Sequence, residues 1–436
     1  MKTAVEAIEW IHSLLSFGMK PGLKRMEWML EALNHPENEL HAVHVAGTNG
    51  KGSTVSFMRH ILQEDGWVVG TFTSPYIERF EERISVNGQP ISEEDLVWAA
   101  SLVRPLVEKL AQTELGSPTE FEVITTMMFL YFAHRAQPDI CLIEVGLGGR
   151  FDSTNVITPL VSIITMIGHD HMHILGETLG AIAKEKAGII KKNVPVVVGQ
   201  VEGGALAVIK EKAEYEHAHL SLLGDSFFLS KQELYSFVYE DTEPIMFKIG
   251  MVGKHQHHNA ALALKATMLL EEKVGQSISR RAKQVGIQKA TWPGRLEWLA
   301  KEPPLLLDGA HNQEGFVALA KALKAHFPNK LIRMFIGSTV EKDMSWIVDA
   351  MEEAELVTTF YFTTFDFHRA AGAEALYRQA ITTYKKSEPN WKEAIPCVYQ
   401  SLTTDEVLVV TGSLYFISEV RSYLQKNLQS DVKGSN

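Results

Sequence analysis

The sequence predicts a two-domain α/β protein. The chain has 436 residues, more than one hydrophobic core usually serves. Apolar strand-like runs alternate with helical stretches, and runs such as residues 140–143 are apolar at every position. Strands of that kind are typical of parallel sheets covered by helices on both faces. The alternation breaks at residues 292–295 and then resumes, so we predict a first domain over 1–295 and a second over 296–436.

In the first domain we predict a mostly parallel sheet with helices between its strands. The strand-like runs lie at 40–46, 67–73, 139–146, 160–167 and 194–199. The helical stretches lie near 53–64, 92–113, 120–136 and 177–188. Residues 219–250 alternate short apolar and polar segments instead, which indicates a small antiparallel patch. A helix that contains Asn259 follows, and then another that runs to about residue 289.

The second domain repeats the alternation on a smaller scale, which predicts a smaller α/β domain of the Rossmann-like kind. Its strands are expected at 304–308, 331–336, 357–363 and 406–411. Its helices are expected at 313–327, 373–386 and 414–427. In parallel α/β sheets the carboxyl ends of the strands border the ligand crevice. Side chains that directly follow a strand are therefore the first candidates for function.

The composition excludes several classes of protein. The 42 Lys and Arg residues against 53 Asp and Glu residues give a net charge of −11, which argues against a general nucleic-acid binder. Cys141 and Cys397 lie far apart in apolar strand-like runs, so we expect buried thiols rather than a disulfide framework or a zinc site. The N-terminus lacks the apolar core of a signal peptide, and no apolar stretch approaches the roughly 20 residues that cross a bilayer. We expect a cytoplasmic protein with neither a membrane nor a nucleic acid as partner.

The most informative segment is 44–54, His-Val-Ala-Gly-Thr-Asn-Gly-Lys-Gly-Ser-Thr, which joins a predicted strand to a predicted helix. Glycines let successive backbone N–H groups turn toward one anion, and the start of a helix adds partial positive charge. Lys51 can reach the β- and γ-phosphates of a nucleotide, and a nearby hydroxyl can ligate Mg²⁺. The string departs from the strict Walker pattern at Val45 and Gly52, and a plain glycine turn is the alternative. We interpret it as a variant P-loop with the nucleotide-binding candidates Thr48, Asn49, Gly50, Lys51, Gly52, Ser53 and Thr54.

Two further strand ends carry side chains suited to a metal site. Glu144 follows apolar residues and precedes a glycine-rich run at 146–149, so its carboxylate is placed to ligate Mg²⁺. The alternative is a carboxylate satisfied by the backbone amides of that run. Residues 169–173 contain three histidines and an aspartate, but no second cluster supports zinc. One imidazole that completes an oxygen-rich Mg²⁺ site is the functional interpretation, and surface histidines are the alternative.

Two other segments carry charged residues. Lys186 lies on a helical stretch at 183–191, and such side chains usually form a solvated face, but this helix comes one loop after the histidines. In the second domain Asp308 and His311 follow a predicted strand. With Arg295 nearby in the sequence, they are candidates to face the nucleotide, and a purely structural turn is the alternative. Asn312 suits the N-cap of the next helix under both interpretations.

Taken together, these segments resemble the folylpolyglutamate synthase/dihydrofolate synthase family, a branch of the Mur-ligase-like ATP-dependent amide ligases. The matching residues are 44–53, 73–76, 82–84, 144–155, 168–171, 175–176, 183–188, 255–256, 259–261, 292–297 and 308–312. The matches run in order from about residue 16 to residues 411–415 and cover nearly the whole chain. The resemblance implies an N-terminal P-loop NTPase-like domain that binds ATP, a C-terminal ligase domain, and an active site between them.

The resemblance also implies a reaction. ATP phosphorylates a carboxylate to an acyl phosphate, the amine of an amino acid attacks it, and phosphate leaves as the amide forms. In this family the carboxylate belongs to a pteroate or folate and the amine to L-glutamate. Lys51 and Mg²⁺ stabilise charge on the transferring phosphoryl group, and positioning supplies much of the remaining catalysis. The implied cofactors are ATP and two Mg²⁺ ions, with K⁺ as a further cation.

Residue roles are carried over by position. Ser53, Ser74 and Glu144 match the ligands of a Mg²⁺ that bridges the phosphates, and Glu144 and His171 match those of a second Mg²⁺. Lys186 falls where the family carries a carbamylated lysine, whose negative charge can stabilise Mg²⁺. The catalytic candidates are therefore Lys51, Glu144, His171, Lys186 and Asp308. The candidates that contact ATP from the hinge and the second domain are Asn259, Arg295, Asp308 and His311.

The loop at 74–83 matches the segment that closes over the folate. The implied substrate residues are Ser74, Pro75, Tyr76, Arg83, Phe121 and Asp152. Core packing is the alternative for Phe121. The implied partners are tetrahydrofolate or folylpolyglutamates, L-glutamate and, for members with both activities, dihydropteroate, and the family resemblance favours a monomer. Phe151 and Ser153 stand where members with both activities often carry Leu and Ala, so we rank the folylpolyglutamate reaction first.

Two other functions compete with this interpretation. One is a Mur-type ligase that joins an amino acid to a cell-wall precursor, which the Glu-Arg-Ile run at 82–84 disfavours. The other is a regulatory module that hydrolyses ATP without forming an amide. A protein that only binds nucleotide needs fewer reactive side chains, so the joint presence of Lys51, Glu144, His171 and Asp308 disfavours that module.

Overall fold

The computed structural model describes residues 1–14, 22–241, 243–342 and 344–433, with only the backbone described from residue 427 onward. The start of the motif matches, near residue 16, lies outside the described residues. The chain forms two compact units. Unit 1 comprises Met1–Gly250 and Gln256–Thr291, and unit 2 comprises Met251–His255 and Trp292–Asn436. The last residue of unit 1 is thus Thr291. The domain boundary predicted from the sequence lies four residues later, after residue 295.

Unit 1 contains a sheet in the order β4-β3-β2-β5-β1-β6-β7-β8 within the described ranges. Its strands are β1 Ala42–Ala46, β2 Val69–Phe72, β3 Ile84–Val86, β4 Gln89–Pro90, β5 Ile140–Glu144, β6 Val161–Ile164, β7 Val196–Val198 and β8 Leu220–Leu222. All neighbouring pairs are parallel except β2–β3 and β3–β4. β1 lies between β5 and β6, so the segments that follow these three strands emerge at one edge of the sheet.

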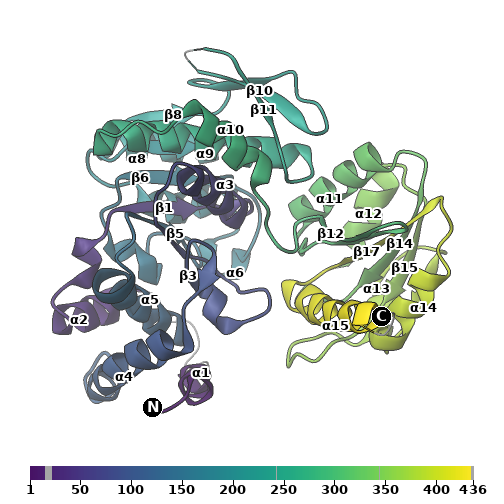
Figure 1. Ribbon diagram of the computed structural model, residues 1–436, viewed down its shortest axis with the longest axis horizontal. Helices are drawn as coiled ribbons and strands as arrows, with labels where there is room; N and C mark the ends of the chain where they lie inside the picture. Colours follow the sequence, from purple (N-terminus) through teal and green to yellow (C-terminus); the bar gives the residue numbers. More distant parts are fainter. Residues whose placement is uncertain (15–21, 242, 343, 434–436) are drawn as a thin grey trace. The chain divides into compact units, whose positions relative to one another are not determined.

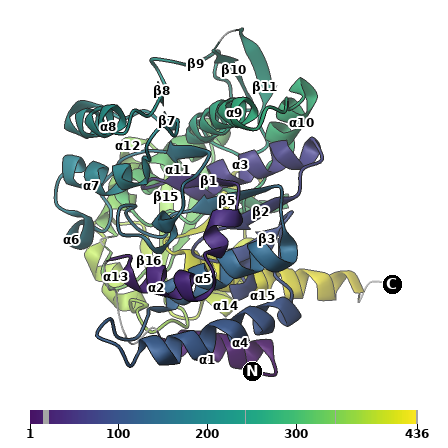
Figure 2. The same cartoon turned by 90° about the vertical axis from the view of Figure 1, so that its left-hand side faces the viewer.

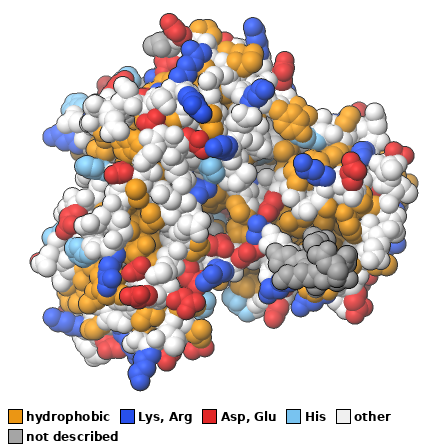
Figure 3. Space-filling view, viewed as in Figure 1, with side chains coloured by type: hydrophobic (Ala, Val, Ile, Leu, Met, Phe, Trp, Pro, Cys, Tyr) orange, Lys and Arg blue, Asp and Glu red, His pale blue; other side chains and the backbone are white. Residues whose placement is uncertain are grey.

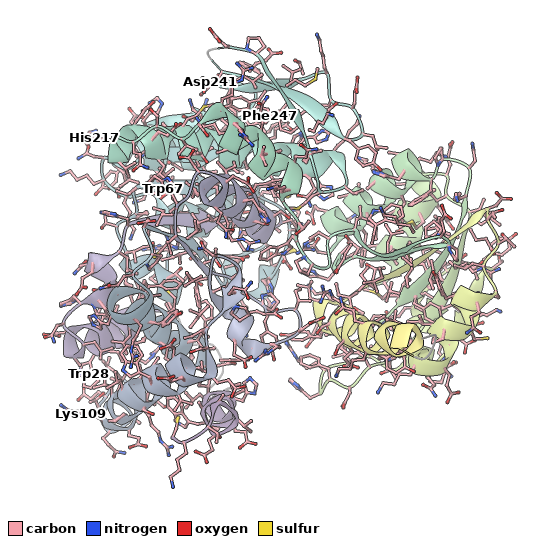
Figure 4. All side chains as sticks on the ribbon, in the orientation of Figure 1. Trp28, Trp67, Lys109, His217, Asp241 and Phe247 are labelled. Carbon is pink, nitrogen blue, oxygen red and sulfur yellow. The ribbon has the colours of Figure 1, made fainter. Side chains whose placement is uncertain are left out.

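Helices cover both faces of this sheet (Figure 1). On one face pack α1 Ala4–Ser13, α2 Lys24–Ala32, α4 Glu93–Leu110 and α5 Glu120–Tyr131, over a core that includes Phe72, Cys141 and Ile143. Figure 4 shows how this layer is tied together at its edge, where the Nζ of Lys109 lies 5.7 Å from the centre of the Trp28 ring. The other face is covered by α3 Lys51–Glu64, with α9 Lys254–Val274 and α10 Arg280–Lys289 beyond it.

The remaining α-helices of unit 1 among the described residues are α6 Met172–Leu175, α7 Leu179–Lys186 and α8 Gly203–Tyr215. α7 and α8 enclose a core with β6 and β7 that contains Ile164, Val196 and Val198. Because successive residues of a strand face opposite sides, these alternate positions form one face of the sheet.

A second, antiparallel sheet lies at one end of unit 1, beyond α9 and α10 (Figures 1 and 2). In the described part of the chain it consists of β9 Phe228–Ser230, β10 Ser236–Glu240 and β11 Ile245–Lys248 in the order β11-β10-β9. Phe237 and Phe247 stack at 5.6 Å between ring centres on its buried side. The predicted antiparallel patch is thus confirmed for 228–248, but residues 220–222 instead pair in parallel with β7 and extend the main sheet.

Unit 2 contains a smaller sheet in the order β12-β13-β17-β14-β15-β16, as far as the described residues extend. Its strands are β12 Glu297–Lys301, β13 Pro304–Leu307, β14 Leu331–Ile336, β15 Thr358–Phe362, β16 Lys385–Ser387 and β17 Glu406–Thr411. Its helices are α11 Gln313–His326, α12 Ser345–Glu353, α13 Ala373–Gln379, α14 Trp391–Gln400 and α15 Leu414–Lys433. Val407 and Val409 pack under α11 and α12, whereas Leu408 and Val410 pack with α14 and α15. The predicted smaller α/β unit is confirmed.

Two sequence-based expectations in unit 2 are wrong. The helix predicted at 373–386 ends at Gln379, because the Nζ of Lys385 donates to the carbonyls of Tyr377 and Ala380 and residues 385–387 pair with β15 as β16. Cys397 is exposed on α14 rather than buried in a strand. That helix buries Trp391 and Ile395, which are one turn apart, and so turns Cys397 away from the core. Cys141 is a buried thiol on β5, as predicted.

The surface carries both signs of charge. On the face shown in Figure 3, Lys and Arg side chains are interspersed with Asp and Glu side chains, in keeping with the net charge of −11. No helix among the described residues is long and apolar enough to span a membrane.

Candidate active site

The loop between β1 and α3 adopts a shape that only glycine permits at two positions. Gly47 has φ +150°, and a Cβ there would lie 1.8 Å from the Oγ1 of Thr165. Gly50 has φ +89°, and a Cβ there would lie 2.3 Å from the Oδ1 of Asn259. The Thr165 hydroxyl donates to the carbonyl of Asn49 at 2.6 Å, which holds the loop against the end of β6. Local backbone chemistry and one neighbouring strand thus fix the loop.

The loop leads into an uncapped helix start. Gly50 is the N-cap of α3, and among the described residues no side chain caps this helix. The first amides of a helix have no acceptor within the helix, and they carry the positive end of its dipole. The loop therefore offers N–H groups to an anion such as a phosphate, so the residues present fit a bound nucleotide.

Lys51 and Glu144 are brought together at this edge of the sheet. The Nζ of Lys51 donates to the carbonyls of Gly47 at 3.0 Å and Thr48 at 3.3 Å, so the side chain lies back over the loop. The same atom lies 3.8 Å from the Oε1 of Glu144, whose side chain is 6% exposed. A cation and a carboxylate at the head of an uncapped helix suit a phosphate with its metal ion.

The remaining P-loop candidates have defined places. The Thr48 hydroxyl donates to the carbonyl of Gly168 and accepts from the Gly168 amide, which ties the loop to the segment after β6. Ser53 is buried in the first turn of α3, and the Thr54 hydroxyl donates to the carbonyl of Gly50. Asn259 on α9 contacts the loop at Gly50 and donates through its Nδ2 to the Oε1 of Gln256 at 2.9 Å.

Lys186 is buried, with 4% of its surface exposed, so it does not belong to a solvated helix face. Burial is the main cause that lowers the pKa of its amine to about 7. The positive charge of Lys51 acts in the same direction, whereas Asp170 and Asp152 act in the opposite direction. The glycine-rich loop after β5 packs directly on the end of α7, because a Cβ at Gly149 would lie 3.0 Å from the Lys186 carbonyl. A buried amine of this pKa is partly neutral near pH 7.

His171 lies at the start of α6 with φ +49°, and its side chain is 43% exposed. Its Nε2 lies 3.8 Å from the Oδ2 of Asp170, and its amide donates to the Oδ1 of the same residue. Within the described ranges, no group of three or more His, Cys, Asp or Glu side chains is arranged to hold a metal ion. A cation held by Glu144 and His171 would therefore also need hydroxyl, phosphate or water oxygens, as Mg²⁺ commonly does.

The predicted folate loop begins just after β2. Ser74 and Pro75 follow that strand, and the amide of Thr73 donates to the carbonyl of Arg83 at 3.0 Å, which joins the two ends of the loop. The Arg83 guanidinium lies 5.3 Å from the centre of the Tyr76 ring and 5.6 Å from that of Phe80. The loop is thus folded around one cationic side chain.

Phe121 and Asp152 meet across the glycine-rich loop after β5. A Cβ at Gly146 would lie 2.5 Å from the Phe121 ring and 3.1 Å from the Oδ2 of Asp152. The ring centre of Phe121 lies 5.8 Å from that of Phe72, so one side of Phe121 does pack on the core. The partly buried ring and the buried carboxylate therefore both lie close to Gly146.

Asp152 takes part in a buried hydrogen-bonded chain. Its Oδ2 accepts from the Leu147 amide at 2.8 Å, and its Oδ1 accepts from the amide of Thr154 at 3.0 Å and from the hydroxyl of Thr154 at 2.5 Å. The Nε2 of His44 lies 2.8 Å from that hydroxyl. Burial lowers the pKa of His44 to about 3 and raises the pKa of Asp152. His44 is therefore neutral, and its Nε2–H donates to Thr154, which donates to Asp152.

In unit 2 the side chain of Asp308 organises the turn after β13. Its Oδ2 accepts from the amide of Leu296 and its Oδ1 from the amide of Ala310, both at 2.9 Å. Burial raises the pKa of Asp308, and the charge of Arg295 opposes that rise. The Nδ1 of His311 lies 2.9 Å from the Gly309 carbonyl. Arg295 lies just before β12, and Asp308 and His311 lie just after β13, which pairs with β12, so the three residues lie at the same end of this strand pair.

Comparison with known proteins supports a single family. Residues 45–267 match the model of the Mur ligase middle domain, and residues 294–414 match that of the Mur ligase glutamate ligase domain. The chain is 44% identical over 426 residues to a dihydrofolate synthase/folylpolyglutamate synthase of Bacillus subtilis, an alignment that covers 96% of this chain and 99% of that protein. The chain belongs to the folylpolyglutamate synthase/dihydrofolate synthase family.

Other members of the family agree in sequence and fold. A folylpolyglutamate synthase of Lacticaseibacillus casei is 35% identical, with 96% of this chain and 98% of that protein covered. The crystal structure of a folylpolyglutamate synthase from Thermotoga maritima matches with a TM-score of 0.85 and 33% identity over 97% of each chain. A folylpolyglutamate synthase complex with AMPPCP and folate matches with a TM-score of 0.80 and 32% identity over 97% of this chain and 99% of that one.

The predicted family and its two-unit α/β fold are thus confirmed. The relatives are named folylpolyglutamate and dihydrofolate synthases, and a matching complex holds AMPPCP and folate, which supports this interpretation over a cell-wall ligase. Within unit 1 the structure places Lys51 beside Glu144, Lys186 in the field of Lys51, and Asn259 against Gly50. The roles carried over to individual residues from other family members stay predictions.

Three residues that contact the candidate site residues or support them were not singled out from the sequence. His44 and Thr154 support Asp152 through hydrogen bonds. The Oε1 of Glu120 lies 3.8 Å from the Nη2 of Arg83. A signal for His44 was available, since it is a histidine inside an otherwise apolar strand that leads into the P-loop. Glu120 gave a weaker signal because an acidic residue in the first turn of a helix is common for electrostatic reasons alone.

Proposed function

We propose that this chain uses ATP to add L-glutamate to the γ-carboxyl group of a tetrahydrofolate or folylpolyglutamate. The observation that carries the proposal is the pairing of Lys51 with Glu144 at the uncapped start of α3. The names of the relatives and the folate in a matching complex support the substrate. ATP would transfer its γ-phosphoryl group to the carboxylate, and the amine of glutamate would then displace phosphate from the acyl phosphate.

Each side chain has a part in this scheme. The amides of the P-loop and the Lys51 ammonium would bind the β- and γ-phosphates and offset charge on the transferring group. Ser53, Ser74, Glu144 and His171 are the residues that would hold two Mg²⁺ ions. Bound Mg²⁺ would supply charge neutralisation between phosphate and carboxylate oxygens. Arg295, Asp308 and His311 would contact ATP from unit 2, and K⁺ is a further cation to test.

Lys186 would act as a carbamate. A neutral amine attacks CO₂, forming an N–C bond and releasing one proton, and the lowered pKa of Lys186 supports this step near pH 7. The product is an anion that can orient a Mg²⁺ ligand, whereas an ammonium would repel the cation. Lys186→Ala should lower turnover, and removal of CO₂ and bicarbonate should lower the activity of the wild-type protein alone. Equal activity of the wild-type protein with and without CO₂ and bicarbonate would contradict the proposed carbamate.

Dihydrofolate synthase activity is the second candidate function. The Bacillus subtilis relative is named as both a dihydrofolate synthase and a folylpolyglutamate synthase, whereas the Lacticaseibacillus casei relative is named only as a folylpolyglutamate synthase. Phe151, which departs from the pattern of members with both activities, is 46% exposed beneath the Arg150 guanidinium at 4.8 Å. An exposed ring of this kind does not fill the core, so its effect on substrate choice has to be measured.

The deciding experiment measures phosphate release from ATP with Mg²⁺ and L-glutamate, and confirms the amide product by mass. We expect product with tetrahydrofolate. Product with dihydropteroate as well would make the enzyme bifunctional. Product with neither substrate would overturn the folate assignment.

A further inference from the structure

The hydroxyl of Thr48 is hydrogen-bonded to the segment that follows β6. It donates to the carbonyl of Gly168 at 3.1 Å and accepts from the amide of the same residue at 3.0 Å. Thr48 is 8% exposed, so water competes little for these bonds. A hydroxyl has one proton to donate, whereas the oxygens of an ionised phosphate only accept. The Thr48 side chain therefore cannot donate to a nucleotide phosphate while it donates to Gly168.

Further hydrogen bonds join the P-loop to the same segment. The amide of Thr48 donates to the carbonyl of Met166 at 3.0 Å. The hydroxyl of Thr165 donates to the carbonyl of Asn49 at 2.6 Å. Among these contacts, the bonds of the Thr48 hydroxyl reach farthest along the segment, to Gly168. The placement of the chain after Gly168 thus depends on Thr48.

His171 lies between two anchored points of the chain. Gly168, three residues before it, is bound to Thr48. The amide of Leu175 donates to the His171 carbonyl at 3.0 Å, and the Leu175 side chain lies against the loop after β5, since a Cβ at Gly148 would lie 2.9 Å from its Cδ2. The His171 side chain is 43% exposed, so packing alone does not fix it. The position of the imidazole therefore depends on the two backbone anchors.

We propose that Thr48 is a positioning residue that holds His171 in place for the Mg²⁺ ion of the bound nucleotide, and that its side chain does not contact the nucleotide. This inference rests on the proposed function, because it takes His171 to be a Mg²⁺ ligand. The backbone amides of the same loop would bind the phosphates. One loop would then place both the nucleotide and an imidazole ligand of its metal ion.

This arrangement predicts a coupling between two ligands. Nucleotide and Mg²⁺ should each raise the affinity of the protein for the other, and by the same factor, because binding free energies are linked. Loss of the Thr48 hydroxyl should reduce that factor and leave the affinity for the nucleotide alone unchanged. A side chain that bound the phosphates directly would instead change the affinity measured without metal.

The test measures the dissociation constant of AMPPCP by equilibrium dialysis, once with EDTA and once with saturating Mg²⁺. Thr48→Val removes the hydroxyl but keeps the shape of the side chain, so the constant with EDTA should stay within about 2-fold of wild type. The tightening of AMPPCP by Mg²⁺ should decrease by about 5- to 30-fold, because two hydrogen bonds are lost. Thr48→Ser keeps the hydroxyl and should retain most of the Mg²⁺ effect.

A double variant tests whether Thr48 acts through His171. His171→Ala should itself reduce the effect of Mg²⁺ on AMPPCP binding. Thr48→Val combined with His171→Ala should then lose no more than His171→Ala alone, because the positioned group is already absent. If the two losses multiply, Thr48 acts on the nucleotide or the metal independently and the proposal is wrong. An unchanged Mg²⁺ effect in His171→Ala would overturn it as well.

Thr267→Val is the matched control for the loss of a buried hydroxyl. Thr267 is buried in unit 1, and its hydroxyl donates to the Ala263 carbonyl within α9 at 2.7 Å. This variant should leave both AMPPCP constants unchanged. If Thr48→Val weakens AMPPCP equally with EDTA and with Mg²⁺, Thr48 contacts the nucleotide and not the metal ligand. If it changes neither constant, its hydrogen bonds serve the fold alone. Either result contradicts the proposal.

The wild-type protein provides a second measurement if Thr48→Val does not fold. AMPPCP with EDTA should slow hydrogen exchange in a peptide that contains residues 168–171, because the loop and this segment are joined. Unchanged exchange with AMPPCP bound would overturn the coupling. Failure to add glutamate to tetrahydrofolate would instead overturn the proposed ligase, whereas the AMPPCP constants decide the role of Thr48. The two failures are therefore distinguishable.

Discussion

The Nζ of Lys51 lies 3.8 Å from the Oε1 of Glu144, although the two residues lie on different elements of unit 1. The contact arises because β1 and β5 are parallel neighbours with Val45 opposite Glu144, so the segments after them start at the same sheet edge. In that position the lysine can offset negative charge on a phosphate while the carboxylate holds a cation.

Replacing Lys51 with alanine should abolish phosphoryl transfer. The ammonium that offsets the phosphate charge is lost, so we expect phosphate release to fall by about 10³-fold or more. Release with tetrahydrofolate and glutamate is the measurement. Lys192→Ala, at an exposed lysine of the same unit, should keep normal activity. Near-normal turnover of Lys51→Ala would contradict the P-loop assignment.

Replacing Gly50 with alanine should weaken ATP binding by about 10-fold or more. The added Cβ would lie 2.3 Å from the Oδ1 of Asn259, and the Nδ2 of the same side chain donates to the Oε1 of Gln256, so this side chain cannot readily move. Gly66 is the matched control, since its φ of +91° is nearly the same but nothing lies within 4 Å of a Cβ there. Gly66→Ala should lower the free energy of unfolding by about 1 kcal/mol and leave ATP affinity unchanged. Equal ATP affinities in both variants would show that the Gly50 contact is unimportant.

Lys186 should give the folded protein a measurable pH dependence. Its pKa is about 7 in the folded chain against 10.5 for an ordinary lysine, so the unfolded chain binds more protons between these pH values. The contribution of this residue to stability therefore increases as pH rises from about 7 toward 10, by at most about 1.4 kcal/mol per pH unit. Urea unfolding in CO₂-free buffer at several pH values should show a flatter profile for Lys186→Met. Identical slopes for the two proteins would mean that the amine is not buried as a free base.

Replacing Thr154 with valine should destabilise unit 1 and perturb the loop that supports Asp152. The buried His44 loses its acceptor, and Asp152 loses a hydroxyl donor at 2.5 Å. We expect a decrease of about 1–3 kcal/mol in the free energy of unfolding, measured with denaturant. Thr154→Ser keeps the hydroxyl, so its free energy of unfolding should decrease much less. If Thr154→Ser destabilises the protein as much as Thr154→Val, loss of the hydrogen bonds does not account for the effect.

Features that depend on local chemistry followed from the sequence alone. The glycines of the P-loop, the lysine after them and the apolar strand before them predicted the nucleotide loop, because φ angles and helix starts depend on neighbouring residues. Asn312 caps α11 by accepting from the Gly315 amide, as its position suggested. The alternation of apolar runs likewise predicted the strands at the centre of both sheets.

Features that depend on distant contacts were decided only by the tertiary structure. The charges around Lys186 suggested a solvated helix face, but the residue is buried, with the glycine-rich loop against its backbone, and burial lowers its pKa. His44 and Thr154 are separated by 110 positions and share a hydrogen bond only because a strand and a loop meet. The sequence by itself thus determined the fold class, the family and the nucleotide loop. Burial and the pairing of polar groups required the folded chain, because desolvation and hydrogen bonding depend on which residues come together in space.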